Sequence, residues 1–314
     1  MLVTMNFCVI IPTFNEAPVL SRCVNAVRAS HQFAVSISGQ QQRVGRRLRF
    51  VVTDGGSTDG TQEAAAHLGC EVLGPAPGPG KGRGFQLAFA TDHVMPRGGA
   101  QSLSEEIGCD DDGGICGGWE PIDDDSTVLL FLHADCIIAE TALPALARSF
   151  SPAPGEPGCD VATLRLQFSL PPGASAPRRC FFQCCEGWCF RGDGLWRSFG
   201  DQAIAITPRA LRRAGGFPRW PLFEDVELFR RCRRAARSAP AWGAKRGREE
   251  DPVRLKRVVK VDAPVVASIR RFEQHGDLRY AAKCWLLVSL FALGASPEWL
   301  AGKYGRRWRV TPVT

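Results

Sequence analysis

The sequence predicts an α/β domain with a mostly parallel sheet, helices on both of its faces and a helical C-terminal segment. The 314 residues, 45% hydrophobic and 23% charged, are enough for one sizeable core and exclude a wholly disordered chain. Short apolar runs alternate with segments of helical periodicity, as they do where helices connect parallel strands. We therefore expect a single domain over residues 1–314.

The first half shows this alternation most clearly. Apolar runs that end in turn residues predict buried strands, and apolar residues three and four apart predict helices. The expected strands are Phe7–Ile11, Leu48–Thr53, Cys70–Leu73 and Val128–Leu132, and the expected helices are Ala17–Ala29, one ending at His67, and Phe85–Val94. The first strand is expected to stop at Pro12.

The second half is less regular, and two segments interrupt the pattern. Residues 97–127, rich in glycine and acidic residues, and residues 235–251 predict flexible insertions. The expected strands are Val161–Leu170, which alternates as a half-exposed strand would, Gly200–Thr207 and Arg257–Val261, and the expected helices are Pro177–Arg191, Phe223–Arg234, Leu278–Leu293 and Pro297–Tyr304.

The apolar runs are too short for a membrane span. The longest, Cys284–Ala295, is about a dozen residues, against the roughly 18 that a membrane helix needs. The first residues lack the pattern of a signal peptide, so we expect a cytoplasmic protein whose 13 cysteines are reduced. We interpret Leu278–Leu293 as a buried C-terminal helix. Docking to an anionic or lipid-linked acceptor is the alternative, so membrane contact is expected to be at most peripheral.

Charge is divided unevenly between the halves. Residues 1–157 carry 10 Lys and Arg against 18 Asp and Glu, whereas residues 158–314 carry 29 against 14. A basic half suits nucleic acid, an anionic membrane surface or a phosphorylated substrate, and equally a plain Arg-rich surface. Because aromatic residues are not interleaved with the basic ones on a recognised module, nucleic acid is not expected as a partner.

Acidic residues follow three of the expected strands, where ligands bind to parallel sheets. Glu16 and Asp54 are suited to hydrogen-bond a base or a ribose, with Thr13 and Asn15 beside them. Asp135 is suited to hold a divalent cation on a diphosphate, which needs only one or two carboxylates from the protein. The alternative for Asp135 is a helix cap. His133 precedes it by two residues, so both side chains point to the same side.

A glycine-rich stretch supplies candidate phosphate contacts. Gly80–Gly84 departs twice from the P-loop pattern, but a basic, Gly-rich stretch that opens a helix can bind a diphosphate through its N–H groups. Lys81 and Arg83 are the candidates, and a flexible loop is the alternative.

The second half supplies the candidate catalytic groups. Glu224 and Asp225 open a helix, either as ordinary partners of its dipole or as the general base for an attacking hydroxyl. Asp201 and Gln202 are candidates to order an acceptor or the loop that carries it. His275 is a candidate ligand or helix cap.

Taken together, these segments resemble a family-2 glycosyltransferase of the GT-A fold, and within it the radical-SAM- and selenodomain-associated (arsenosugar-type) subfamily. The matching motifs, in family order, are Ile11–Glu16, Asp54–Thr61, Phe131–Asp135, Gly200–Gln202, Gly215–Pro218, Pro221–Leu228, Arg270–Gly276 and Leu293–Pro297. They span nearly the whole chain outside the two insertions. Three positions depart from the wider family or the subfamily, namely Gly55, His133 and Phe272.

The resemblance implies a Rossmann-like GT-A domain that transfers a sugar, with inversion, from a nucleotide-diphosphate sugar, expected to be UDP-linked, to a hydroxyl acceptor. It implies Asp225 as the catalytic base with Glu224 beside it, and Asp135 as a ligand of Mg²⁺ or Mn²⁺. His275 and Arg271 would reach the diphosphate, with His275 as a second metal ligand. The acceptor is expected to be a small molecule or a lipid-linked one.

Two other functions remain alternatives. One is a catalytically idle protein of the same fold that binds an anionic partner through its Arg-rich C-terminal half, although such a protein would have no need of Glu224, Asp225 and Asp135. The other is a nucleotidyltransferase, which would carry a Gly-rich, Lys-bearing loop directly after the first strand, where this chain has Pro12–Glu16.

Overall fold

The computed structural model describes residues 4–37, 43–75, 82–96, 122, 126–152, 158–191, 197–237 and 258–305. Its centre is an eight-stranded sheet of order β3-β2-β1-β4-β7-β6-β8-β5. The strands are β1 Met5–Thr13, β2 Val44–Asp54, β3 Glu71–Leu73, β4 Thr127–Phe131, β5 Ile137–Ile138, β6 Val161–Phe168, β7 Ile204–Ile206 and β8 Val258–Ala267. β7 runs antiparallel to β4 and β6, β5 runs antiparallel to β8, and the other pairings are parallel.

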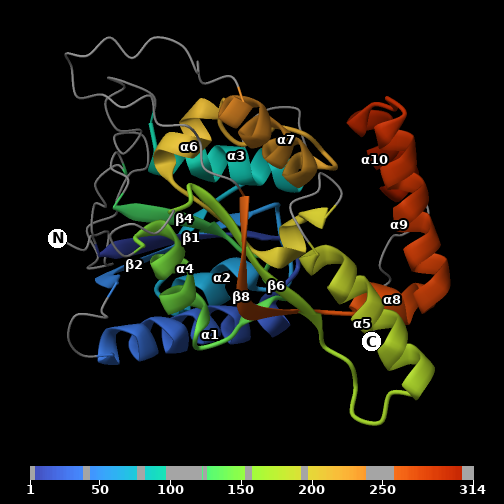
Figure 1. The fold of residues 1–314 in the computed structure, drawn as a ribbon, viewed down its shortest axis with the longest axis horizontal. Helices are drawn as coiled ribbons and strands as arrows, with labels where there is room; N and C mark the ends of the chain where they lie inside the picture. Colours follow the sequence, from blue (N-terminus) through green and yellow to red (C-terminus); the bar gives the residue numbers. More distant parts are fainter. Residues whose placement is uncertain are drawn as a thin grey trace.

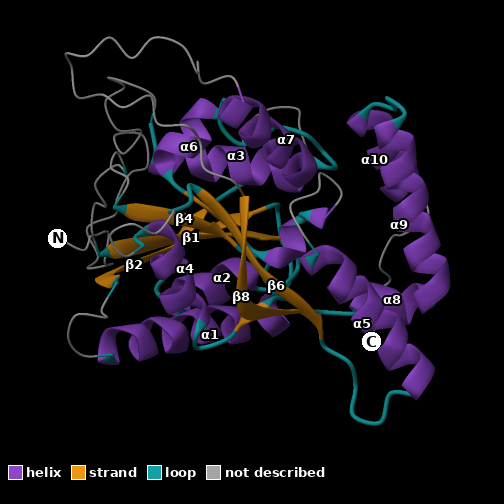
Figure 2. Ribbon diagram, viewed as in Figure 1, coloured by secondary structure: helices purple, strands orange, loops and turns teal. Residues whose placement is uncertain are grey.

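Helices cover both faces of the sheet (Figures 1 and 2). The helices are α1 Ala17–Ser36, α2 Thr61–His67, α3 Arg83–Val94, α4 Ala142–Phe150, α5 Ala176–Phe190, α6 Pro208–Arg213, α7 Glu224–Arg237, α8 Arg270–His275, α9 Asp277–Ala292 and α10 Pro297–Gly305. Apolar side chains of α1, α2 and α4 form one core with the sheet, and those of α3, α6 and α7 form the other. The predicted fold class is therefore confirmed, including the helical C-terminal segment.

The strand β1 passes through Pro12 and ends at Thr13, two residues after the expected end at Ile11. Alternate residues of a strand bond to alternate neighbours, and Ile10 bonds to the β4 side, where it accepts from the amide of Leu132. The ladder to β4 ends at Ile10, so Pro12 lies beyond it. The missing N–H of Pro12 therefore leaves no ladder bond unmade.

All three expected strands of the second half differ from the prediction. The strand expected over Arg257–Val261 is β8, which runs six residues further, to Ala267. The strand predicted over Gly200–Thr207 is only β7, because Gly200–Gln202 form a 3₁₀ turn before it. β6 was expected to be half-exposed, but it lies inside the sheet between β7 and β8, and its first four residues are buried. Apolar and polar residues alternate in β6 because its two faces are covered by different layers of the protein. Neither face is exposed to water along the whole strand, as the prediction had assumed.

The interpretation of Leu278–Leu293 as a buried helix is wrong. Of the residues of α9, only Tyr280 and Leu287 are buried. Figure 1 shows α9 and α10 at the edge of the molecule, away from the sheet. Among the residues that the structure describes, no helix is both long and apolar enough to cross a bilayer.

Candidate active site

The turn that follows β2 is organised by Asp54, which also hydrogen-bonds to the end of the neighbouring strand β1. Its carboxylate accepts hydrogen bonds from Thr13 Oγ1 (2.9 Å), Gln62 Nε2 (2.8 Å), the Ser57 hydroxyl and the amides of Gly56 and Ser57. Burial raises the pKa of Asp54, but these hydrogen bonds outweigh it and hold the pKa below its ordinary value. The carboxylate is thus ionised and bound to its own loop, and its side chain is buried.

Asn15 connects the two strand ends from the other side. Its amide nitrogen donates to Ser57 Oγ (2.8 Å), and its side-chain oxygen accepts from the amide of Thr58 (2.9 Å). Its φ of 54° lies in the left-handed region, which asparagine tolerates better than most residues. The predicted Thr13, Asn15 and Asp54 therefore form one hydrogen-bonded unit.

Glu16 and Asp135 share the guanidinium of Arg270, at the start of α8. Arg270 Nη2 lies 2.9 Å from Glu16 Oε1 and 3.7 Å from Asp135 Oδ2. Burial raises the pKa of Glu16 above its ordinary value, and the charge of Asp135 adds to this effect, although Arg270 opposes it. Two predicted residues that are far apart in sequence are thereby brought to one cation.

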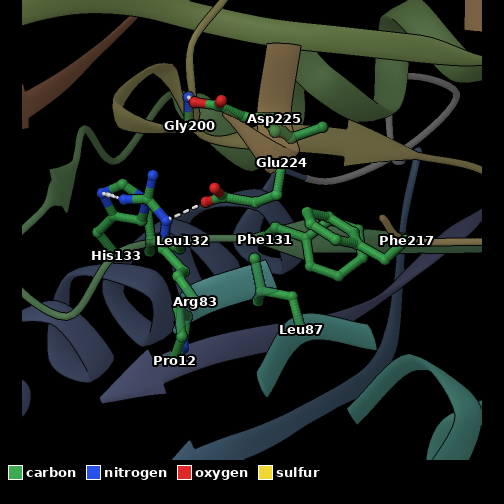
Figure 3. A pocket seen from close by; sticks show the side chains of 11 residues that line it. Pro12, Arg83, Leu87, Phe131, Leu132, His133, Gly200, Phe217, Glu224 and Asp225 are labelled. Atoms are coloured by element: carbon green, nitrogen blue, oxygen red, sulfur yellow. Dashed lines mark hydrogen bonds and ion pairs between the residues drawn. The ribbon is translucent and has the colours of Figure 1, made fainter. Parts of the chain in front are cut away.

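Arg83 links the acidic groups of α7 to the end of β4. Its Nε donates to the buried carboxylate of Glu224, and its Nη1 lies 2.8 Å from His133 Nε2. Figure 3 shows Arg83 between these two side chains. Since arginine only donates, Nε2 of His133 must accept, and the ring hydrogen lies on Nδ1, 2.9 Å from Asp201 Oδ1.

Asp225 lies beside this network with its carboxylate against the 3₁₀ turn. Its Oδ2 accepts from the amide of Gly200 (2.6 Å), and its Oδ1 accepts from the amide of Val226 (2.7 Å). Burial and the neighbouring charge of Glu224 together raise the pKa of Asp225 to about 6, although Arg83 and the two backbone hydrogen bonds oppose them. A carboxylate with a pKa near neutrality is suited to accept a proton.

The pocket between these groups is small. It is lined on its polar side by Arg83, His133, Glu224 and Asp225, and on its apolar side by Phe131 and other residues drawn in Figure 3. Its volume is about 10 Å³, roughly what one water molecule needs.

Two glycines allow backbone segments to approach closely at the pocket. A Cβ on Gly84, at the start of α3, would lie 2.3 Å from the carbonyl oxygen of Trp220 and 2.7 Å from that of Pro218. A Cβ on Gly200 would lie 3.0 Å from His133 Nε2 and 3.3 Å from Asp225 Oδ2. The missing side chain of Gly84 therefore lets the loop before α7 pack directly against α3. Part of the Gly-rich stretch thus has a packing role.

A candidate metal cluster is formed by His133, Asp135 and Cys136, whose ligand atoms lie within 4.8 Å of one another. Burial raises the pKa of the Cys136 thiol well above its ordinary value, which leaves it protonated and a poor ligand. A hard cation such as Mg²⁺ or Mn²⁺ prefers oxygen, so Asp135 is the member of this cluster that suits such an ion. His275 lies outside this cluster, where its ring stacks on Tyr280 at 5.9 Å.

The other predicted residues have structural partners. Arg271 donates to the hydroxyl of Tyr304. Gln202 is buried and holds the loop before it, since its Nε2 donates to the carbonyl of Arg197 (2.9 Å) and its Oε1 accepts from Lys260. Lys81 lies outside the described residues, as do most of the two expected insertions.

Sequence reasoning missed two residues of the site. Gln86 is buried on α3 and donates to the carbonyls of Thr13 (2.8 Å) and Thr53 (2.9 Å), which fixes the ends of β1 and β2. Its only signal was a position three residues after Arg83, on the same helix face. Arg270 adjoins the predicted Arg271, but no sequence pattern pointed to Glu16 as its partner.

Residues 8–91 match the family model described as Glycosyl transferase family 2. This match agrees, over that segment, with the family that the motifs resemble. The match ends before β4, so the rest of the chain, with its candidate catalytic residues, lies beyond it. No match to a curated protein was found.

Several solved structures are similar to this chain at low sequence identity. TarS 1-349 of S. aureus is 14% identical, with a TM-score of 0.46, over 84% of this chain and 60% of that one. The mannosyltransferase PcManGT of Pyrobaculum calidifontis, in complex with GDP-Man and Mn²⁺, is 16% identical, with a TM-score of 0.49, over 93% and 66%. Glucosyl-3-phosphoglycerate synthase of Mycobacterium tuberculosis is 16% identical, with a TM-score of 0.41, over 83% and 69%. The chain thus spans less than two thirds of the TarS and mannosyltransferase chains.

Proposed function

We propose that this protein is an inverting glycosyltransferase that moves a sugar from a nucleotide-diphosphate sugar to a hydroxyl acceptor. The observation that carries the proposal is Asp225, a buried carboxylate whose pKa is raised to about 6 and which lies in a pocket with Arg83. The family match of residues 8–91 supports the donor class. The nucleotide is proposed to be UDP, and the subfamily named above stays a prediction.

The proposed reaction is a direct displacement at the anomeric carbon. Asp225 takes the proton of the acceptor hydroxyl while the oxygen of that hydroxyl forms the new bond to the anomeric carbon. The bond from the carbon to the diphosphate oxygen breaks, and the nucleoside diphosphate leaves with the electron pair. Cationic groups near the leaving oxygen stabilise its growing charge, which suits Arg83 and Arg270 on the two sides of His133 and Asp135.

The donor is proposed to bind at the ends of β1, β2 and β4. Because Asp54 is buried and bound within its own turn, we assign it the task of shaping that turn for the base or ribose. Glu16 is more accessible and offers a carboxylate beside it. A divalent cation held by Asp135 would neutralise the diphosphate and activate it as a leaving group.

Donor binding is tested first, with a thermal-shift panel of nucleoside diphosphates and nucleotide sugars, each with and without Mn²⁺. A ligand at a hundred times its dissociation constant stabilises the fold by about 2.7 kcal/mol, which gives a clear shift. One nucleotide sugar is expected to give the largest shift. The absence of a shift from every nucleotide would reject the proposal in favour of the catalytically idle protein.

The base is tested with Asp225→Asn, which keeps the size of the side chain. We expect transfer, or slow hydrolysis of the donor in the absence of an acceptor, to be lost while donor affinity stays within about twofold. Asp262→Asn is the matched control, because Asp262 is an exposed carboxylate on β8 paired with Arg165. A collapse of donor affinity in Asp225→Asn would make Asp225 a binding residue.

A further inference from the structure

The outer face of α9 is a continuous apolar stripe. At about 3.6 residues per turn, residues three, four and seven apart share one face of a helix. Arg279 apart, the exposed positions of this helix and its C-cap follow that spacing: Leu278, Ala282, Trp285, Leu286, Ser289, Ala292 and Leu293. None of them is charged. Leu278 is 74% exposed, Leu286 59% and Leu293 85%.

Apart from Trp285, this stripe faces away from the rest of the protein. The buried residues Tyr280 and Leu287 lie on the opposite side of α9. Figure 1 places α9 at the edge of the molecule. Large apolar side chains gathered on one exposed face mark a contact surface, whereas single exposed ones are ordinary.

Two tryptophans outside α9 are also exposed, and one of them adjoins the stripe. Trp285 packs edge-on against Trp188 of α5, with ring centroids 5.8 Å apart, and Trp299 of α10 is 51% exposed. Tryptophan is enriched where a protein meets the boundary between lipid headgroups and acyl chains, since its ring is apolar and its N–H is polar.

Basic residues flank the stripe. Arg279 is exposed next to Leu278, and Lys303 lies over the ring of Trp299 at 5.4 Å. Residues 270–314 contain eight Lys and Arg against three Asp and Glu. This charge complements an anionic surface, and a second copy of the same basic segment would be repelled by it.

We propose that the stripe on α9, with Trp188 and Trp299, rests on the surface of an anionic lipid bilayer. The helix would lie in the plane of the interface with its apolar side chains among the acyl chains and its basic flank at the headgroups. This inference goes beyond the proposed function, because vesicle binding requires neither a donor nor transfer.

Vesicle flotation tests the proposal with the full chain. We expect it to float with phosphatidylcholine vesicles that contain phosphatidylglycerol, and more weakly with pure phosphatidylcholine or at high salt. Leu286→Glu should reduce binding to the anionic vesicles about tenfold or more, because it places a charge in the middle of the stripe. Phe33→Glu is the matched control, since Phe33 is 39% exposed on α1, and it should leave binding unchanged.

Quenching by brominated lipids gives a second readout that does not depend on the Glu variants. Tryptophan fluorescence should be quenched in brominated anionic vesicles, and Trp285→Phe should lose a measurable part of that quenching. Failure to float with either vesicle, or equal flotation of wild type and Leu286→Glu, would overturn the proposal. A dimer in light scattering that Leu286→Glu dissociates, without vesicle binding, would assign the stripe to a second copy instead.

Discussion

Replacing Asp225 by asparagine should make the folded protein more stable at neutral pH while removing its activity. The folded state raises the pKa of Asp225 from 3.8 to about 6. One pKa unit corresponds to about 1.4 kcal/mol, so keeping this carboxylate ionised in the fold costs about 3 kcal/mol above pH 6. Asparagine carries no charge and so avoids this cost. Its NH₂ group cannot accept a hydrogen bond from the amide of Gly200 or Val226, and the lost bond reduces the gain in stability by about 1 kcal/mol. The net gain expected at pH 8 is about 1–3 kcal/mol.

The sign of the pH dependence follows from proton linkage. Between pH 3.8 and 6 the folded state binds the Asp225 proton more tightly than the unfolded state does, so this group lowers the free energy of unfolding as pH rises. About 2 kcal/mol of this decrease in the free energy of unfolding should occur between pH 4.5 and pH 8. The free energy of unfolding of Asp225→Asn, minus that of wild type, should rise by this amount over that range.

Urea unfolding at several pH values measures that difference, and contributions from other titrating groups cancel in it. Asp262→Asn serves as the control, because the side chain of Asp262 is 74% exposed and should give a nearly constant difference. If the difference for Asp225→Asn is also constant with pH, the carboxyl titrates normally in the fold. The reasoning that makes it a base with a pKa near 6 would then fail.

Three further changes test other parts of the site. Gly84→Ala should destabilise the fold by about 1–3 kcal/mol in urea unfolding, because the added Cβ would overlap backbone oxygens. Gly302→Ala is the control and should be neutral or stabilising, since a Cβ there meets no atom within 4 Å. Equal effects of the two substitutions would contradict the packing role of Gly84. Arg270→Gln removes the cation shared by Glu16 and Asp135, so Mn²⁺ should bind several-fold more tightly in calorimetry, and unchanged affinity would count against a cation site there. Asp135→Ala should weaken donor binding and abolish any effect of Mn²⁺ on that binding. If the variant binds the donor as tightly as wild type in the presence of Mn²⁺, Asp135 is not the metal ligand.

The sheet could be predicted from sequence wherever its cause is local. The strand at 128–132 was found because a run of large apolar residues ends abruptly at His133, and β4 differs from the prediction by one residue at each end. The positions of Asp54 and Asp135 at strand ends followed from the same runs. The match over residues 8–91 includes Asp54 but ends before β4 and Asp135.

The remainder depends on contacts between distant residues. The 3₁₀ turn over Gly200–Gln202 is held by Asp225, which bonds to Gly200 from 25 residues later, and by His133, which contacts Asp201; no local propensity records either contact. The ion pair of Arg270 joins residues 254 positions apart. The outward direction of α9 was also unpredictable, because its sequence is apolar enough for either a buried helix or an exposed stripe.

The pairing of Arg270 with Glu16 also has a consequence for synthesis on the ribosome. The first strands and α1 emerge early, and translation delivers about 5–20 residues per second, so they wait through most of the chain before Arg270 follows. During that interval Glu16 and Asp135 lack their arginine, and β6 lacks its neighbour β8. A nascent chain released before residue 270 would therefore contain the segment of residues 8–91 with Glu16 still unpaired, so about the last seventh of the message completes a contact of the first third.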